Sequence, residues 1–146
     1  MTPYELKIRQ KLKKDFLHYT EKCLQIRTKS GHIAPFFLNQ AQVVIHQALE
    51  KQRMEKGYVR ALIVKGRQQG CSTYIQARFY WRLSHQPALR AYVMTHLDDA
   101  TQNLAAIVKR YHAYTPELVR PSCRRSNAKE LYFDKLESSY HFATAK

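Results

Sequence analysis

The sequence contains few acidic residues for its size. Its 146 residues include 25 lysine and arginine residues but only 11 aspartate and glutamate residues, so the formal net charge is +14. A charge excess of this size favours a polyanionic partner, and nucleic acid is the most common one. Basic proteins of the ribosomal or chromatin type fit the charge equally well.

The cysteines lack the spacing of a metal site or of a disulfide framework. Cys23, Cys71 and Cys123 are odd in number and lie far apart, without a C-x-x-C or Cys/His pattern. We therefore expect free thiols in a reducing compartment and no zinc site. Long apolar runs are missing too, because nothing approaches the roughly 20 residues of a membrane span. The N-terminus, rich in lysine and glutamate, does not resemble a signal peptide.

Two helices are expected before residue 58. Residues 2–5, TPYE, form a capping-box pattern, and apolar residues then recur at helical spacing as far as Ile26. The lysines off this stripe either face solvent or contact DNA. After a loop over residues 28–35, Asn39 and Gln42 have the spacing of a second capping box, and Gly57 ends that helix.

A strand, a loop and a helix start are expected over residues 59–73, whose sequence is VRALIVKGRQQGCST. The spacing predicts a buried strand over residues 60–64, a tight loop over residues 65–70 and a helix from residue 71. Backbone N–H groups and the helix dipole converge on one anion-sized position in such a turn, as in a phosphate-binding P-loop. The alternative is a glycine turn between any strand and helix of an α/β protein.

The regular P-loop pattern, G-x-x-x-x-G-K-[ST], is incomplete in this loop. Gly70 fits the second glycine and Ser72 fits the hydroxyl that would bind Mg²⁺, but Cys71 occupies the position of the phosphate-binding lysine. A thiol cannot neutralise a phosphate. The cation must therefore come from Lys65 or Arg67, at the other end of the loop.

Gln42 has two interpretations. Its amide caps its own helix, or its paired donor and acceptor bind the N6/N7 edge of adenine with Phe36 or Phe37 near the ring.

The loop and Gln42 together resemble the large subunits of tailed-phage terminases, the ATPases that package DNA. Their P-loops often read R-Q-x-G-x-[ST], some with a lysine at the start of the loop, and a preceding L-N-x-x-Q-like segment binds adenine. Leu38, Asn39 and Gln42 match that segment. The residues that match the loop are Lys65, Arg67, Gln68, Gly70, Ser72 and Thr73.

The resemblance implies a role for each loop residue. Backbone amides of residues 66–72 would hold the β- and γ-phosphates of ATP, and Lys65 would replace the missing lysine. Arg67 would sense or stabilise the γ-phosphate, Ser72 would bind Mg²⁺ and Gln42 would select adenine. The other residues expected at the nucleotide are Gly66, Gln68, Gln69, Gly70, Cys71 and Thr73.

Helices and strands alternate beyond the loop. The pattern predicts a helix that ends before Pro87, a strand over residues 88–95 and a helix with an apolar face from Ala100 to Tyr111. This alternation is typical of a parallel sheet. Two further strands, over residues 131–134 and 138–144, are expected to form a hairpin.

Residues 114–127 lack periodicity and are expected to form a loop with Arg120, Arg124 and Arg125. An arginine-rich loop on a basic protein contacts phosphate backbones, or it is a mobile solvated loop.

The acids needed for ATP hydrolysis are missing. Such an ATPase needs an apolar strand that ends in Asp, usually followed by Glu, but Lys135 follows Asp134. By the resemblance, this Walker B strand would begin just past Lys146. The sequence also lacks the acidic cluster of a two-metal terminase nuclease domain. We therefore expect a fragment or truncated product that binds nucleotide weakly and does not hydrolyse it alone.

The sequence predicts an α/β P-loop NTPase fold (RecA/ASCE-like), with a parallel sheet flanked by helices over residues 35–146 and a helix and loop over residues 1–34. The resemblance implies ATP and Mg²⁺ as cofactors. It also implies double-stranded DNA, the portal protein and the terminase small subunit as partners of a homo-oligomeric ring in the bacterial cytoplasm, away from membranes. The alternatives are a fragment of a helicase-like or other nucleic-acid-dependent P-loop ATPase and a non-enzymatic basic nucleic-acid-binding domain.

Overall fold

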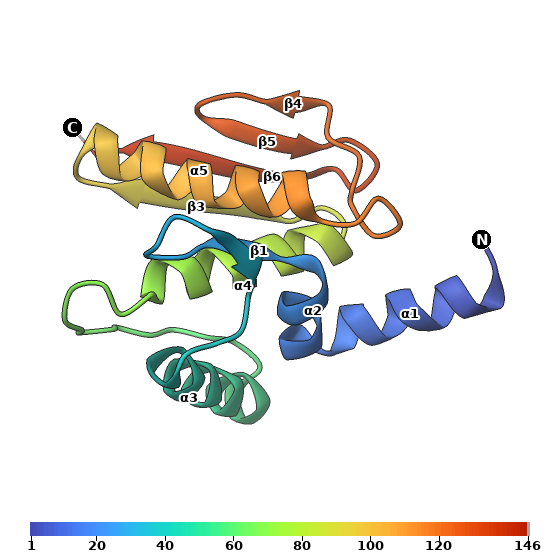
Figure 1. The fold of residues 1–146 in the computed structure, drawn as a ribbon, viewed down its shortest axis with the longest axis horizontal. Helices are drawn as coiled ribbons and strands as arrows, with labels where there is room; N and C mark the ends of the chain where they lie inside the picture. Colours follow the sequence, from blue (N-terminus) through green and yellow to red (C-terminus); the bar gives the residue numbers. More distant parts are fainter. Residues whose placement is uncertain (146) are drawn as a thin grey trace.

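Helix α4 (Cys71–His85) lies between a four-stranded sheet and helix α3 (Gln40–Lys56) in the computed structural model, which describes residues 1–145 (Figure 1). The remaining elements, in chain order, are α1 (Pro3–Lys14), α2 (Phe16–Cys23), β1 (Gln25–Arg27), β2 (Ile33–Pro35), β3 (Arg90–Thr95), α5 (Asp98–Tyr114), β4 (Arg125–Ser126), β5 (Glu130–Phe133) and β6 (Ser138–Thr144). The fold is therefore mixed α/β, as the alternation of patterns predicts.

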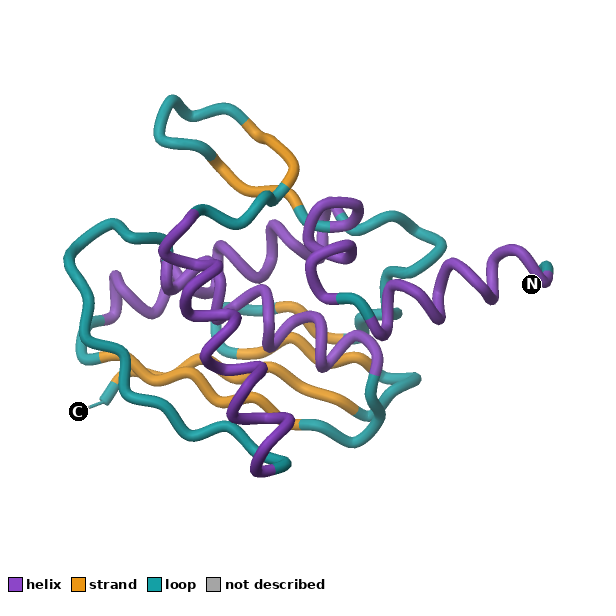
Figure 2. Tube along the Cα trace, turned by 90° about the horizontal axis from the view of Figure 1, so that it is seen from below, coloured by secondary structure: helices purple, strands orange, loops and turns teal. Residues whose placement is uncertain are grey.

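The main sheet has the strand order β3-β6-β5-β4 and contains one parallel pair. Strands β3 and β6 run parallel, from Arg90 opposite Ser139 to Thr95 opposite Thr144. Strands β5 and β4 extend the sheet in antiparallel order. The expected parallel sheet is thus present only as the β3–β6 pair, while the β5–β6 hairpin is confirmed. Strands β1 and β2 form a separate hairpin (Figures 1 and 2), in which β1 contacts helix α5 and β2 contacts helix α2.

The core between the helices and the sheet is rich in tyrosine. Tyr74 and Tyr80 on α4, Tyr111 on α5 and Tyr140 on β6 are fully buried. Their hydroxyls have partners: Tyr111, for example, donates to the carbonyl of Thr73 at 2.9 Å. A buried tyrosine contributes a large apolar area, and its satisfied hydroxyl also fixes the position of the ring. No helix within residues 1–145 has the length and apolar character needed to cross a lipid bilayer.

The N-terminal helix is interrupted, which corrects the expectation of one helix to Ile26. Asp15 leaves the helical conformation, with φ −114° and ψ 97°, and its carboxylate accepts the N–H of His18 at 2.9 Å. Helix α2 therefore starts with a cap of its own. Ile26 lies on β1, and part of the expected loop over residues 28–35 forms β2. The capping box of Thr2 and Glu5 is confirmed.

Residues 60–64 do not form the predicted buried strand. Leu62 and Val64 are fully exposed, at 100% and 101%. The backbone of Arg60 is bound instead by the side chain of Gln52 on α3, through hydrogen bonds of 2.9 and 2.6 Å. A strand needs a neighbour about 4.8 Å away to satisfy its N–H and C=O groups. Within residues 1–145 no strand pairs with this segment, so its apolar composition alone does not produce one.

Exposure of residues 60–64 predicts that Leu62→Asp leaves the fold intact. We expect the free energy of unfolding, measured in urea by Trp81 fluorescence, to change by less than about 0.5 kcal/mol. The control Leu131→Asp, at a fully buried position on β5, should abolish cooperative folding because it buries a charge without a partner. Comparable losses in both variants would mean that residues 60–64 are packed in solution.

Candidate nucleotide-binding loop

The loop over residues 65–70 ends at a helix N-terminus that has no side-chain cap. Gly70 is the N-cap of α4, in the left-handed conformation with φ 77° and ψ 13°, and Gln68 is also left-handed at φ 58°. Gly70 has no side chain that could bind the N–H groups of the first turn. These N–H groups, together with the helix dipole, form a local positive pole that suits an anion.

Gln42 connects helix α3 to this loop. It is buried, its Oε1 accepts the N–H of Asn39 at 2.9 Å, and its Nε2 donates to the carbonyl of Gly70 at 2.8 Å. The side chain of Asn39 also donates to the carbonyl of Gln69, at 3.3 Å. The predicted capping box is confirmed. The contact with Gly70 was not predicted, since the two residues lie 28 positions apart and no local pattern relates them.

The two phenylalanines proposed for the adenine ring have different environments. Phe36 is buried and stacks on Tyr111, with ring centroids 6.3 Å apart. Phe37 is 62% exposed. Only Phe37 therefore has a free ring face.

Most side chains of the predicted phosphate site lie at the surface. Lys65, Arg67 and Ser72 are exposed, and none of them has a hydrogen-bond or ion-pair partner among residues 1–145. Both predicted cations are thus free to approach an anion. Cys71 is 7% exposed, so its thiol is not accessible to a ligand. The other predicted residues divide between exposed (Gly66, Gln68, Gln69) and half-buried (Gly70, Thr73).

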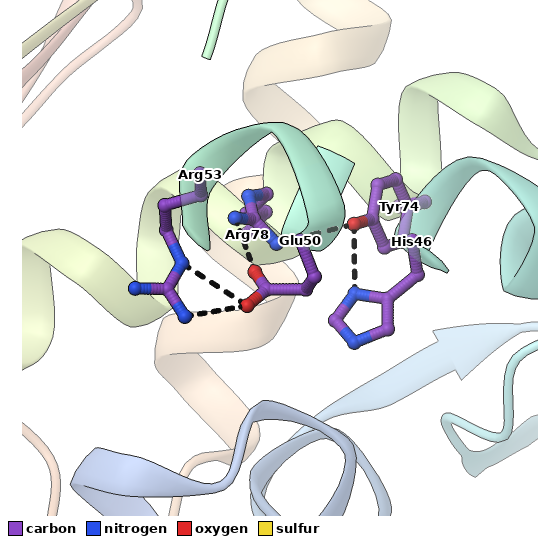
Figure 3. A network of polar contacts seen from close by, with 5 residues as sticks. All are labelled: His46, Glu50, Arg53, Tyr74 and Arg78. Atoms are coloured by element: carbon purple, nitrogen blue, oxygen red, sulfur yellow. Dashed lines mark hydrogen bonds and ion pairs between the residues drawn. The ribbon is translucent and has the colours of Figure 1, made fainter. Parts of the chain in front are cut away.

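A polar network holds helix α3 against helix α4 (Figure 3). Arg78 donates to Glu50 at 2.5 Å and to the hydroxyl of Tyr74 at 3.3 Å, and that hydroxyl is 2.9 Å from Nδ1 of His46. Arg53 donates to the other carboxylate oxygen of Glu50, at 2.7 Å. This network sets the distance between the two helices. It thereby places Gln42, at the start of α3, beside the start of α4.

The charge of Glu50 is stabilised by its two arginines. Burial raises the pKa of Glu50, but hydrogen bonds and charge from Arg53 and Arg78 outweigh burial and lower that pKa to about 2. Burial lowers the pKa of His46, an effect that the negative charge of Glu50 opposes. Arg78 is 8% exposed at its side chain and therefore depends on Glu50 as its counter-ion.

The three arginines of residues 120–125 do not form one cluster in the structure. Arg120 interacts with Glu117 at 3.4 Å and lines a hollow with His112. Arg125 lies on strand β4, which corrects the expectation of a loop at this position, and it pairs with Glu130 at 3.3 Å. Arg124 is exposed between the two. The two paired arginines thus belong to different surfaces.

Within residues 1–145, no three His, Cys, Asp or Glu side chains are grouped so that they could hold a metal ion. No protein-family model matches this sequence, and no curated protein matches it significantly. The assignment of a function therefore depends on the loop motif and on its geometry.

The loop geometry predicts that Gly70→Ala destabilises the protein. A Cβ at Gly70 would lie 2.6 Å from Nε2 of Gln42 and would have to adopt a left-handed φ. We expect a loss of about 1–3 kcal/mol in the free energy of unfolding. Gly66→Ala is the matched control, because its Cβ meets its nearest atom at 3.7 Å. Equal stability of the two variants in urea would exclude the Gln42–Gly70 contact.

The Glu50 network predicts a loss of stability in acid. The folded-state pKa of about 2 lies below the ordinary value of 4.5, so the stabilisation is present above about pH 4.5 and is lost as the pH falls towards 2. Glu50→Gln should lose about 1–3 kcal/mol at pH 7 and show a weaker pH dependence over this window.

Glu55→Gln is the control for Glu50→Gln, since Glu55 is 58% exposed in its pair with Lys51 and surface pairs contribute little. The measurement is urea denaturation from pH 7 to pH 2.5. A Glu50→Gln variant with the wild-type pH profile would contradict the assignment.

Proposed function

We propose that this chain is the ATP-binding part of the large subunit of a tailed-phage terminase, the motor that translocates double-stranded DNA into a procapsid. One observation carries the proposal: the motif GRQQGCST ends at an uncapped helix N-terminus whose Gly70 carbonyl is bound by Gln42. The two motifs that carry the resemblance, 28 residues apart in sequence, are thus in contact.

Two features of the loop support triphosphate binding. The first turn of α4 offers free backbone N–H donors, and Lys65 and Arg67 offer two exposed cations without partners in the described residues. The hydroxyl of Ser72 would bind Mg²⁺, whose other ligands would be phosphate oxygens and water.

Each of these residues would have a different role once ATP is bound. ATP supplies the phosphoanhydride bond whose cleavage drives translocation. Lys65 would neutralise phosphate charge in place of the lysine replaced by Cys71, and Arg67 would contact the γ-phosphate. Gln42 would select adenine with the second N–H of its Nε2 and the second lone pair of its Oε1, which requires the buried amide to become accessible when ATP binds. Its bond to Gly70 would couple the base site to the phosphate loop.

The P-loop NTPase fold would require residues 60–64 to join the sheet. Within residues 1–145 strand β3 pairs on one edge only, and a hollow of about 480 Å³ beside it is lined by Tyr58 and Val59, just before this segment, and by Leu89 and Ala91 among others. An additional strand in this space would give β3 a second neighbour. We propose that the two acids needed for hydrolysis lie on such a strand.

The larger assembly follows from the same proposal. Double-stranded DNA suits the net charge of +14, and a homo-oligomeric ring bound to a portal protein and a terminase small subunit would complete the motor. A helicase-like or other nucleic-acid-dependent P-loop ATPase would use the same loop.

One observation favours a second candidate, a non-enzymatic basic nucleic-acid-binding domain. The loop is not preceded by a paired strand, since residues 60–64 are exposed, and a paired strand is what gives such loops their rigidity.

The test is a titration with a fluorescent ATP analogue in the presence of Mg²⁺. We expect Lys65→Ala to weaken binding by about tenfold or more, because a charge-assisted phosphate contact contributes 1.5–3 kcal/mol. Lys51→Ala removes an exposed lysine on α3 and serves as the control. If MgATP leaves the melting temperature unchanged while DNA raises it, the non-enzymatic domain is the correct assignment.

A further inference from the structure

Within residues 1–145, no helix covers one face of the main sheet. Helices α4 and α5 pack on the face that carries the buried Tyr140 and Phe142 of β6. Side chains alternate along a strand, so Arg90, Tyr92 and Met94 of β3 point to the opposite face. Tyr92 is 67% exposed and Met94 is 69% exposed. We call this the open face; its other residues used below are Arg125, Tyr132, Ser139 and His141.

The strand register brings the aromatic and basic residues of the open face together. Tyr92 lies opposite His141, and their rings stack with centroids 4.8 Å apart and planes 13° from parallel. Nε2 of His141 is hydrogen-bonded to the hydroxyl of Ser139, at 2.8 Å, which fixes the orientation of the imidazole. The stacked imidazole of His141 therefore restricts the movement of the Tyr92 ring.

The neighbouring row of cross-strand pairs has an arginine on each edge strand of the sheet. Arg90 on β3 lies opposite Ser139, Ser139 lies opposite Tyr132, and Tyr132 lies opposite Arg125 on β4. The guanidinium of Arg125 is 5.0 Å from the centre of the Tyr132 ring. Two aromatic surfaces are thus held on neighbouring rows, with a cation at each side of the sheet.

Sheet packing explains only part of this arrangement. Cross-strand aromatic pairs stabilise a sheet by about 0.2–1 kcal/mol, which accounts for the stacked rings. It does not account for the exposure of Tyr92, two residues from Arg90 on the same face of β3, in a chain of charge +14. Two acids line the hollow on the open face: Glu130, which forms an ion pair with Arg125 at 3.3 Å, and the exposed Glu137.

We propose that the open face binds single-stranded nucleic acid. Bases would stack on Tyr92 and Tyr132, and phosphates would contact Arg90 and Arg125. The ligand must be single-stranded because the rings need the faces of bases, and these are hidden inside a duplex. This site shares no residue with the loop over residues 65–70 and does not depend on ATP binding.

The experiment is a fluorescence anisotropy titration of the full chain, without nucleotide, against labelled dT20 and a 20-base-pair duplex. We expect dT20 to bind more tightly than the duplex, and Tyr92→Leu to weaken dT20 binding about fivefold or more. Arg90→Gln should reduce the slope of log K against log salt by about 0.7, the value for one phosphate contact on a single strand.

Tyr4→Leu is the matched control, because Tyr4 is 73% exposed on α1 and lies outside the open face. It should bind dT20 within twofold of the wild type. Thermal unfolding of each variant checks the fold, and Tyr132→Leu repeats the test if Tyr92→Leu unfolds. Equal affinity of the tyrosine variants and the wild type for dT20 would overturn the proposal and would indicate a face that is covered by a protein partner instead. Tighter binding of the duplex would also overturn it, in favour of non-specific charge attraction.

Discussion

The packing of helix α4 is the constraint on which the rest of the structure depends. The helix contacts α2, α3 and α5 as well as strands β3 and β6, and it buries Tyr74, Ala77, Tyr80 and Leu83. Its polar groups are matched too, since Arg78 reaches Glu50 and the indole N–H of Trp81 donates to the carbonyl of Leu12 at 2.9 Å. Because α4 packs against three helices and two strands, it has little freedom to shift, and the position of its N-terminus is well defined.

The well-defined N-terminus of α4 determines the geometry at the end of the candidate loop. The loop itself is exposed and has few contacts, yet its last residue, Gly70, is bound by Gln42 from a neighbouring helix. Glu50 and Arg78 join that neighbouring helix to α4 through a partly buried ion pair. Removing one partner would leave the other charge without a counter-ion, so the pair favours the arrangement in which the two helix N-termini meet.

The positive charge of the chain is distributed over distinct surfaces. Lys65 and Arg67 precede a helix N-terminus, whereas Arg90 and Arg125 lie near the aromatic rings of Tyr92 and Tyr132 on the open face. The first arrangement concentrates backbone N–H donors and suits compact phosphate groups. The second offers flat rings between separated cations and suits a strand of stacked bases. Net charge alone does not distinguish these two uses.

Local interactions were predicted well from the sequence. The capping boxes at Thr2 and Asn39, the left-handed Gly57 at the end of α3 and the helix from residue 71 all depend on residues a few positions apart. Helical and strand periodicities also located α5, β3 and the β5–β6 hairpin. These features arise from hydrogen bonds and side-chain spacing within one segment, which the order of residues specifies directly.

The outcome for residues 60–64 was decided by tertiary structure. Their sequence has strand character, but a strand exists only when a second segment lies alongside, and within residues 1–145 none does. The Gln42–Gly70 bond, the Glu50–Arg78 pair and the stack of Tyr92 on His141 join residues that are 28 or more positions apart. Sequence patterns identified the residue types that make such contacts. The packing of the helices and strands decided which of those residues came into contact. Only that packing determines the distances between parts of the chain that are remote in sequence.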